Sequence, residues 1–257
     1  MIEITGLHKT FNHGRGRNKR VVQAVRGVEF VARDGCITGL LGSNGAGKTT
    51  TLRIAAGLIT PEQGRVVVDG IDVATYPQQA LSRMGVLSDA RGLYPRMTAR
   101  ENIVYYGRLH GLSRTAADDR VKDLAYTLDM QPLLDRRTEG FSQGERMKTA
   151  LARALVHDPP NIVLDEPTNG LDVMATRSLR NALRRLRDEQ RKCIIFSTHI
   201  MQEVERLCDH VVVVAQGRTV AQGSVAELNA RAQQSDFEET FVKLAFKPDD
   251  RQPGDRP

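Results

Sequence analysis

Short apolar runs rich in β-branched residues recur along the chain, and stretches with helical periodicity lie between several of them. The apolar runs predict strands at residues 21–31, 37–41, 66–68, 162–164, 193–197 and 211–214. The helical periodicity predicts helices at residues 48–58, 146–157 and 173–190, and a last helix at 237–244. Buried strands that alternate with helices are typical of the α/β class with a largely parallel sheet.

The proportion of predicted strands and helices changes along the chain, and this change predicts how the chain divides into subdomains. The first 80 residues are richest in strands, which predicts an antiparallel β-subdomain at the N-terminus. Residues 90–150 are mostly helical in pattern and are expected to form a helical subdomain inserted into the α/β core. Residues 246–257 are rich in proline and charge, which predicts a disordered tail behind a single domain of residues 1–245.

Composition excludes several classes of protein. Of the 257 residues, 40% are apolar and 26% charged, a balance typical of a globular chain. The longest apolar runs, such as 36–41 and 211–215, are far shorter than the roughly 20 residues that a membrane helix requires. The N-terminus lacks the pattern of a signal peptide. Three cysteines, Cys36, Cys193 and Cys208, argue against a disulfide framework and fit a reducing cytosol.

The chain is basic, with 37 Lys and Arg against 31 Asp and Glu and a net charge of +6. Such a balance favours nucleic acid, anionic lipid or polyphosphate as a partner without choosing among them. The basic residues concentrate at 13–20 and 177–192, where a solvated loop and the outer face of a helix, respectively, are favoured over a binding role. Because no aromatic residue interleaves them, a single-stranded nucleic acid is disfavoured.

The strongest motif follows the predicted strand 37–41 and opens the predicted helix 48–58. It satisfies the pattern G-x-x-x-x-G-K-[ST] and consists of Gly42, Ser43, Asn44, Gly45, Ala46, Gly47, Lys48, Thr49 and Thr50. Glycines let backbone N–H groups approach phosphate oxygens, and the helix N-terminus adds a positive dipole end. Lys48 can reach the β- and γ-phosphates, and the Thr49 hydroxyl can bind Mg²⁺. The motif therefore predicts a nucleoside triphosphate site.

A second element is the predicted strand 162–164, which is followed by two carboxylates. Asp165 is predicted to hold Mg²⁺, and Glu166 to orient or deprotonate a water molecule for attack on the γ-phosphate. Taken alone, a strand that ends in Asp-Glu is usually a solvated strand terminus. Beside a phosphate loop, the catalytic interpretation is favoured.

Five further segments follow a fixed order along the chain, at Phe11, 92–102, 141–145, 167–172 and 196–199. With the loop and the acidic strand end, they resemble the ATP-binding subunits of ABC transporters over roughly residues 1–245. In that family the segments correspond to an adenine-stacking aromatic, a contact with the transmembrane partner, the signature sequence, the D-loop and the switch histidine. The resemblance implies a P-loop NTPase core with an antiparallel β-subdomain and an inserted helical subdomain. The segments 86–89, 169–177 and 197–204 further resemble the sodium-exporting, NatA-type subunits.

The resemblance also implies roles for single residues. It implies a head-to-tail dimer with two ATP molecules at the interface, each held by the loop of one subunit and by Ser142, Gln143 and Gly144 of the other. Asp172 would link the two sites, and His199 would contact the γ-phosphate and hold the attacking water. Alone, His199 would be interpreted as a strand-end histidine without a ligand, but its Ser-Thr-His context after a buried strand favours the role at the γ-phosphate.

The chain departs from the family pattern in its signature, which differs from Leu-Ser-Gly-Gly-Gln at Phe141, Gln143 and Glu145. Ser142 and Glu145 together form an S-x-x-E capping box, a structural reason for both residues. Ser142 remains a predicted ATP ligand, whereas Glu145 is expected to be mainly a cap.

Two other positions depart from the pattern. Asp89 stands where the family usually has a glutamine, and it is predicted to bind Mg²⁺; the alternative is a loop residue with no such role. Phe11 stands where tyrosine is commoner, and its ring is adequate for stacking on adenine; the alternative is a core phenylalanine.

The sequence therefore predicts an ATP hydrolase at the cytoplasmic face of a membrane. It is expected to use ATP and Mg²⁺, to form a homodimer or heterodimer of ATPase subunits, and to drive export of Na⁺ through a separate transmembrane permease that docks at residues 89–110. One alternative is the export of a drug, a polysaccharide or another cargo. Another is an ABC ATPase of a nucleic-acid complex, which is disfavoured because Thr49 and Asp165 are too close in sequence for a long coiled-coil insertion. A third is a module that uses ATP only as a switch.

Overall fold

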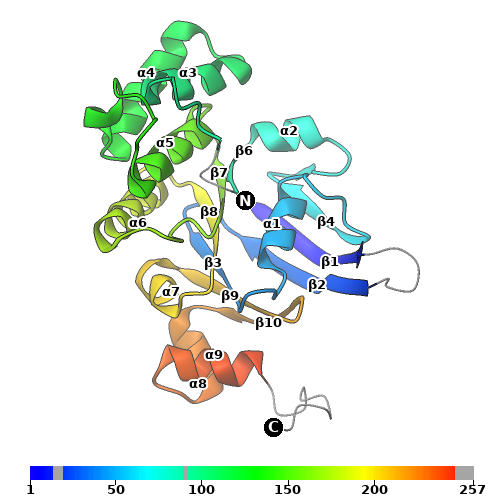
Figure 1. Ribbon diagram of the computed structural model, residues 1–257. Coiled ribbons are helices and arrows are strands. Elements are labelled where there is room, and N and C mark those ends of the chain that lie inside the picture. Colours follow the sequence, from blue (N-terminus) through cyan, green and yellow to red (C-terminus); the bar gives the residue numbers. More distant parts are fainter. Residues whose placement is uncertain (14–19, 89–91, 247–257) are drawn as a thin grey trace.

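A computed structural model of the chain describes residues 1–13, 20–88 and 92–246. Two β-sheets form the centre of the molecule, and helices cover them (Figure 1). A helical lobe lies at one end of the larger sheet, and the last two helices lie at the other end. No helix in these three described ranges is long and apolar enough to cross a membrane.

The larger sheet has six strands and is mostly parallel. Its order is β10 (Arg218–Gly223), β9 (His210–Ala215), β3 (Ile37–Leu41), β8 (Cys193–Thr198), β7 (Asn161–Asp165) and β6 (Met84–Leu87). The five strands from β9 to β6 pair in parallel, and β10 adds an antiparallel edge. Parallel strands are buried on both faces and therefore have continuous apolar sequences, which is why β3, β7, β8 and β9 were predictable. The predicted α/β class is confirmed.

The smaller sheet is antiparallel, as predicted for the N-terminal part. Its order is β2 (Arg20–Ala32), β1 (Ile2–His13), β4 (Gln63–Val68) and β5 (Ile71–Asp72). The strand β1 was not predicted, because it contains no continuous apolar run. Its alternating polar and apolar residues are typical of a half-buried strand, although its register is irregular around Leu7 and Lys9. The long ladder between β1 and β2 holds one face of this sheet against the core.

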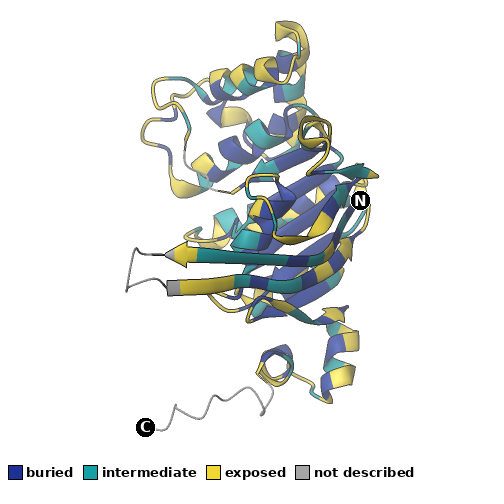
Figure 2. Cartoon of the chain, turned by 90° about the vertical axis from the view of Figure 1, so that its right-hand side faces the viewer, coloured by how far each residue is buried: buried dark blue, intermediate teal, exposed yellow. Residues whose placement is uncertain are grey.

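Three apolar clusters hold the layers together. One joins the smaller sheet and α1 (Lys48–Ala55) to one face of the larger sheet. A second joins the opposite face to α5 (Gln143–Leu155), α6 (Val173–Asp188) and the helical lobe. The third packs the C-terminal helices against β9 and β10. Figure 2 shows the strands of the larger sheet as the most deeply buried part of the chain.

The remaining helices surround these sheets. They are α2 (Pro77–Ser82), α3 (Ala99–Leu109), α4 (Arg114–Thr127), the 3₁₀ turn η2 (Gln131–Leu133), α7 (Met201–Leu207), α8 (Val225–Ala232) and α9 (Phe237–Ala245). The lobe formed by α3, α4 and α5 agrees with the helical pattern of residues 90–150. The predicted helix 48–58 ends earlier, at Ala55, because Gly57 turns the chain with a φ of 66°. Where the domain ends within residues 245–257 stays a prediction.

Candidate functional site

The carboxyl ends of three adjacent strands bring the predicted site together. In the larger sheet β8 lies between β3 and β7, and all three run in parallel. The loop 42–47 follows β3, Asp165 ends β7, and Ser197 pairs with Asp165 near the end of β8. Because parallel strands end at one edge of a sheet, residues far apart in sequence meet there.

Two glycines let the loop 42–47 pass close to neighbouring backbone. A Cβ atom on Gly42 would lie 2.4 Å from the carbonyl oxygen of Val214, and a Cβ atom on Gly47 would lie 2.4 Å from that of Ala24. Gly47 also has a φ of 104°, which side-chain-bearing residues rarely adopt. Gly47 is the N-cap of α1 and has no side chain that could cap the helix, so the first N–H groups of α1 are available to an anion.

Lys48 lies inside this loop with only 4% of its side chain exposed. Its ammonium group donates to the carbonyl oxygens of Gly42 at 2.9 Å and of Ser43 at 3.2 Å. The Glu166 carboxylate lies 3.6 Å away. Burial lowers the pKa of Lys48 below its usual value, and the negative charges of Glu166 and Asp165 oppose that shift. A buried cation at the centre of a glycine loop fits a polyphosphate.

Thr49 and Asp165 form the part of the site that suits Mg²⁺. The Thr49 hydroxyl lies 3.1 Å from a carboxylate oxygen of Asp165, and the Ser197 hydroxyl donates to the same oxygen at 2.6 Å. No group of three His, Cys, Asp or Glu side chains gathers as a metal cage in the described part of the chain. Mg²⁺ commonly takes only one or two protein oxygens and completes its shell with water and phosphate. The residues present therefore fit Mg²⁺ held together with a nucleotide.

Glu166 lies between the two other groups predicted for catalysis. Its Oε1 atom lies 3.6 Å from Nζ of Lys48 and 3.4 Å from Nδ1 of His199. Its backbone has a φ of 46°, a left-handed conformation that is uncommon for a residue with a side chain. Its N–H donates to the Ser197 hydroxyl at 2.9 Å. Sequence reasoning missed Ser197, because a serine at the end of an apolar run gives no signal of its own.

The segment 141–145 begins α5. Ser142 is the N-cap, its hydroxyl accepts from the N–H of Glu145, and the Glu145 carboxylate accepts from the N–H of Ser142. This confirms the predicted capping box. Arg136 donates to Glu145 at 2.7 Å, and the pKa of Glu145 is lowered first by its hydrogen bond from the Ser142 backbone.

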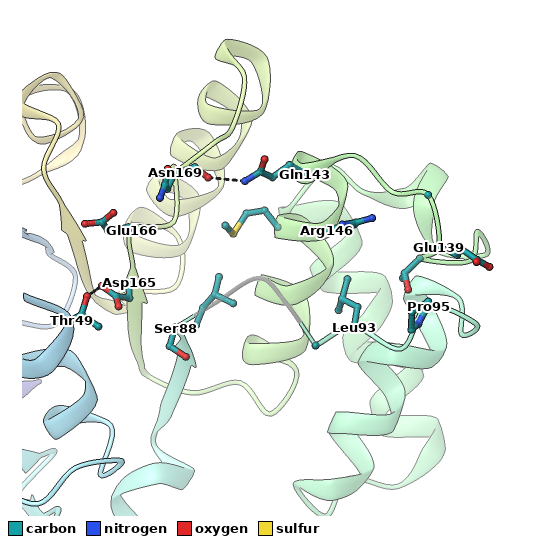
Figure 3. Close-up of a pocket in the computed structure, with 15 residues that line it drawn as sticks. Thr49, Ser88, Leu93, Pro95, Glu139, Gln143, Arg146, Asp165, Glu166 and Asn169 are labelled. Carbon is teal, nitrogen blue, oxygen red and sulfur yellow. Dashed lines mark hydrogen bonds between the residues drawn. The ribbon is translucent and has the colours of Figure 1, made fainter. Parts of the chain in front are cut away.

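The predicted D-loop contacts this helix. The Gln143 side chain donates to the carbonyl oxygen of Asn169 at 3.0 Å (Figure 3). A Cβ atom on Gly144 would lie 2.8 Å from the Ala175 side chain. The carboxylate of Asp172 caps α6 by accepting from the N–H of Ala175 at 2.7 Å. The two segments therefore share one edge of the molecule.

A cleft of about 880 Å³ separates Asp165 and Glu166 from the helical lobe. One wall carries Thr49, Asp165 and Glu166, and the opposite wall carries Leu93, Pro95 and Glu139 (Figure 3). Gln143 and Asn169 lie at its rim in the same view. The other lining residues are Leu87, Ser88, Gly92, Thr138, Gly140, Arg146 and Met147.

Two predicted residues stand apart from this group. Phe11 lies on β1 opposite Val22 and is half-buried rather than part of the apolar core, with the Lys9 ammonium 5.8 Å from its ring centre. Asp89 lies outside the described residues, as does most of the basic stretch 13–20, so both remain sequence-based expectations.

Comparison with known proteins agrees with this geometry. A model of the ABC transporter family matches residues 25–169. The chain is 43% identical to the ABC transporter ATP-binding protein NatA of Bacillus subtilis, over 94% of this chain and 97% of that protein. It is 41% identical to the Nod factor export ATP-binding protein I of Burkholderia lata, over 78% of this chain and 66% of that protein.

Solved structures show the same fold. An ATP-binding subunit of an ABC transporter matches with a TM-score of 0.79 and 26% identity, over 95% of this chain and 98% of that one. A dimeric bacterial ABC transporter cassette matches with a TM-score of 0.76 and 23% identity, over 87% of this chain and 98% of that one. The phosphate loop, the acidic strand end and these likenesses together show that the chain belongs to the ABC transporter family, as an ATP-binding subunit.

Proposed function

We propose that the chain binds Mg²⁺ and ATP at the loop 42–50 and hydrolyses ATP to drive export through a separate transmembrane permease. One observation carries the hydrolytic part of this proposal. The Glu166 carboxylate lies within 3.6 Å of the Lys48 ammonium and within 3.4 Å of the His199 ring. A carboxylate that faces a phosphate-binding lysine and a histidine is placed to orient a water molecule for in-line attack.

Each residue then has a defined task. Lys48 and the backbone N–H groups of residues 43–50 bind phosphate oxygens, and Thr49 and Asp165 hold Mg²⁺. Bound Mg²⁺ supplies positive charge that stabilises the phosphoryl group in the transition state. Glu166 orients or deprotonates the water, and His199 holds it in line. The Phe11 ring, near the carboxyl end of β1, stacks on adenine.

A second copy of the chain, or a related ATPase subunit, completes the site. Ser142, Gln143 and Gly144 lie at the start of α5. Figure 3 shows Gln143 well apart from Thr49 of the same copy. In a head-to-tail dimer Ser142, Gln143 and Gly144 would contact the ATP held by the partner. Val173 and Met174, beside the capping residue Asp172, are 80% and 69% exposed, which suits a surface that becomes buried on dimerisation.

The cargo and the membrane partner are argued from the relatives. The Nod factor export proteins among the relatives support export. Na⁺ as cargo rests on the resemblance of residues 86–89, 169–177 and 197–204 to the sodium-exporting, NatA-type subunits. A drug or a polysaccharide remains the alternative cargo. The permease is expected to dock on the helical lobe, where Tyr94, Tyr105 and Leu109 are exposed. The subunit would then lie at the cytoplasmic face of the membrane, with no role for nucleic acid.

The substitution Glu166→Gln tests the hydrolytic part. We expect ATP hydrolysis to fall by at least about a hundredfold while nucleotide binding persists, because the amide keeps the side-chain volume but is not a base. Glu139→Gln is the matched control, since it removes a carboxylate from the opposite wall of the cleft. Turnover that is unchanged in Glu166→Gln would contradict the assignment.

A pull-down tests the transport part. Tagged Glu166→Gln protein with ATP is captured from detergent-solubilised cells of the source organism, and the proteins that co-purify are identified. Recovery of a multi-spanning membrane protein supports the transport role, and Na⁺ flux through vesicles containing that pair then tests the cargo. Recovery of nucleic acid or ribosomal proteins without a membrane protein would contradict it.

A further inference from the structure

Ser197 occupies a buried position beside the two consecutive acidic residues of the site, Asp165 and Glu166. It lies near the end of β8 with 0% of its surface exposed. Side chains alternate along a strand, so Ser197 faces the same side as Cys193 and Ile195, which pack in the cluster that contains α1 residues. Phe196 faces the opposite side. The hydroxyl therefore points toward the layer from which Thr49 reaches the site.

The chemistry of the neighbours fixes the direction of both hydrogen bonds of this hydroxyl. An ionised carboxylate only accepts, so the Ser197 hydroxyl donates its proton to Asp165 at 2.6 Å. A backbone N–H only donates, so the same oxygen accepts from Glu166 at 2.9 Å. A single hydroxyl thus connects the side chain of one acidic residue to the main chain of the next.

The backbone shows why this connection matters. Asp165 and Ser197 are the last paired residues of the ladder between β7 and β8. At the next residue the chain leaves the sheet, and Glu166 takes a φ of 46°. The N–H of Glu166 therefore donates to the Ser197 side chain rather than to a backbone carbonyl of the neighbouring strand. Unfavourable backbone conformations persist only where surrounding contacts hold them, and the Ser197 hydroxyl is such a contact.

We propose that Ser197 is a positioning residue for both carboxylates of the site, a proposal that rests on the proposed function. Through Asp165 it orients the oxygen that, with Thr49, faces Mg²⁺. Through the backbone of Glu166 it holds the carboxylate between Lys48 and His199. Its hydroxyl forms hydrogen bonds with Asp165 and Glu166, whereas Lys48 is held by the carbonyl oxygens of Gly42 and Ser43.

The substitution Ser197→Ala tests this role. Loss of a buried hydrogen bond to a charged group commonly changes an equilibrium or rate constant by a factor of about 10 to 100. We therefore expect kcat to fall by about that factor. The Mg²⁺ concentration for half-maximal turnover should rise by at least about threefold. Nucleotide affinity measured without Mg²⁺ should stay within about twofold of the original chain. A merely structural role would lower stability without shifting the Mg²⁺ dependence.

Two comparisons control for packing and folding. Thr38→Val removes a buried hydroxyl from the neighbouring strand β3, and that hydroxyl has no hydrogen-bond partner among the described residues. We expect it to leave kcat and the Mg²⁺ dependence unchanged. Ser197→Thr and Ser197→Val differ only by a hydroxyl in place of a methyl group, so they serve if the alanine variant does not fold. The threonine variant should exceed the valine variant in kcat by at least about tenfold.

The outcomes distinguish the positioning role of Ser197 from the proposed function on which it rests. Equal kcat and equal Mg²⁺ dependence in Ser197→Ala and the original chain would overturn the positioning role, as would equal activity of the threonine and valine variants. An original chain whose hydrolysis does not depend on Glu166 would instead overturn the proposed function, and that result comes from Glu166→Gln alone.

Discussion

The Thr49 hydroxyl lies 3.1 Å from the Asp165 carboxylate, although 116 residues separate them in sequence. The topology of the sheet produces this contact. The loop that leads to Thr49 leaves β3, Asp165 ends β7, and both strands pair with β8 in parallel. The contact therefore depends on the order of the strands rather than on local sequence, and it forms only when the whole parallel sheet is assembled.

Thr49→Val should weaken the binding of the Mg²⁺ that turnover requires. Valine keeps the shape of threonine but offers no oxygen, so Asp165 would face the ion alone. We expect the half-saturating Mg²⁺ concentration to rise by about tenfold, as measured by steady-state hydrolysis over a magnesium titration. Thr49→Ser keeps the hydroxyl and should remain within about threefold of the original chain. An unchanged titration with valine would remove Thr49 from the metal site.

Gly42→Ala should damage the phosphate loop. The new Cβ atom would lie 2.4 Å from the backbone oxygen of Val214, and backbone cannot move aside as a flexible side chain can. We expect a loss of about 1–3 kcal/mol in unfolding free energy and at least a tenfold loss of ATP affinity, measured by denaturant titration and by nucleotide binding.

Gly45→Ala is the control for the glycine 42 variant. Gly45 has a φ of 79°, but open space surrounds the position where its Cβ atom would lie. Gly45→Ala should therefore lower the unfolding free energy by about 1–2 kcal/mol, which is the cost of placing alanine in the left-handed conformation. If it impairs ATP affinity as strongly as Gly42→Ala does, the close approach to Val214 is not what the loop requires.

The phosphate loop, the acidic strand end and the capping box were predictable because each consists of residues that are consecutive in sequence. Ser142 and Glu145 illustrate this, since the S-x-x-E pattern specifies both hydrogen bonds that the structure shows. Ser197 was not predictable, because its role depends on which strand lies beside β8 and on the left-handed turn at Glu166. The position of the cleft wall opposite Asp165 could not be predicted either, because the lobe that forms this wall packs through long-range apolar contacts.

His157 should make the stability of the chain depend on pH. Its Nε2 atom is 3.1 Å from the carbonyl oxygen of Met84, and its buried Nδ1 atom has no hydrogen-bond partner in the described ranges. His110 stacks on its ring at 3.8 Å. Burial, with the neighbouring His110 charge as the next cause, lowers the pKa of His157 to about 4. Asp158 opposes the shift, and Lys192 adds to it.

The sign follows from proton binding. Between pH 6.5, the ordinary pKa of a histidine side chain, and about 4 the unfolded chain binds more protons at His157 than the folded chain. The unfolding free energy should therefore decrease as the pH falls through this window, by at most about 1.4 kcal/mol per pH unit. Urea titrations at pH 7.0 and 5.0 measure the loss. His157→Gln, which does not titrate, should lose less over the same interval, and an equal loss would assign the effect to other groups.

Arg180 and Glu203 connect the two helices that follow the predicted D-loop and the predicted switch histidine, His199. Arg180 lies on α6 and Glu203 on α7, with side chains 12% and 9% exposed and 3.8 Å between Nη1 and Oε1. The other carboxylate oxygen of Glu203 is buried without a hydrogen-bond partner in the described part of the chain. A carboxylate so nearly buried depends on this cation, so Arg180→Met should destabilise the fold by about 2–4 kcal/mol.

Two further variants separate the charge of this pair from its packing. Glu203→Gln removes the charge but keeps the side-chain volume. It should lower the unfolding free energy by about 1 kcal/mol, because the arginine retains some access to solvent. The double variant should cost less than the sum, since no carboxylate remains buried without a cation. Urea titrations of the four chains measure the coupling, and Arg177→Met on the exposed face of α6 should stay within about 0.5 kcal/mol of the original chain. Strictly additive losses would show that the ion pair contributes no coupling free energy between α6 and α7.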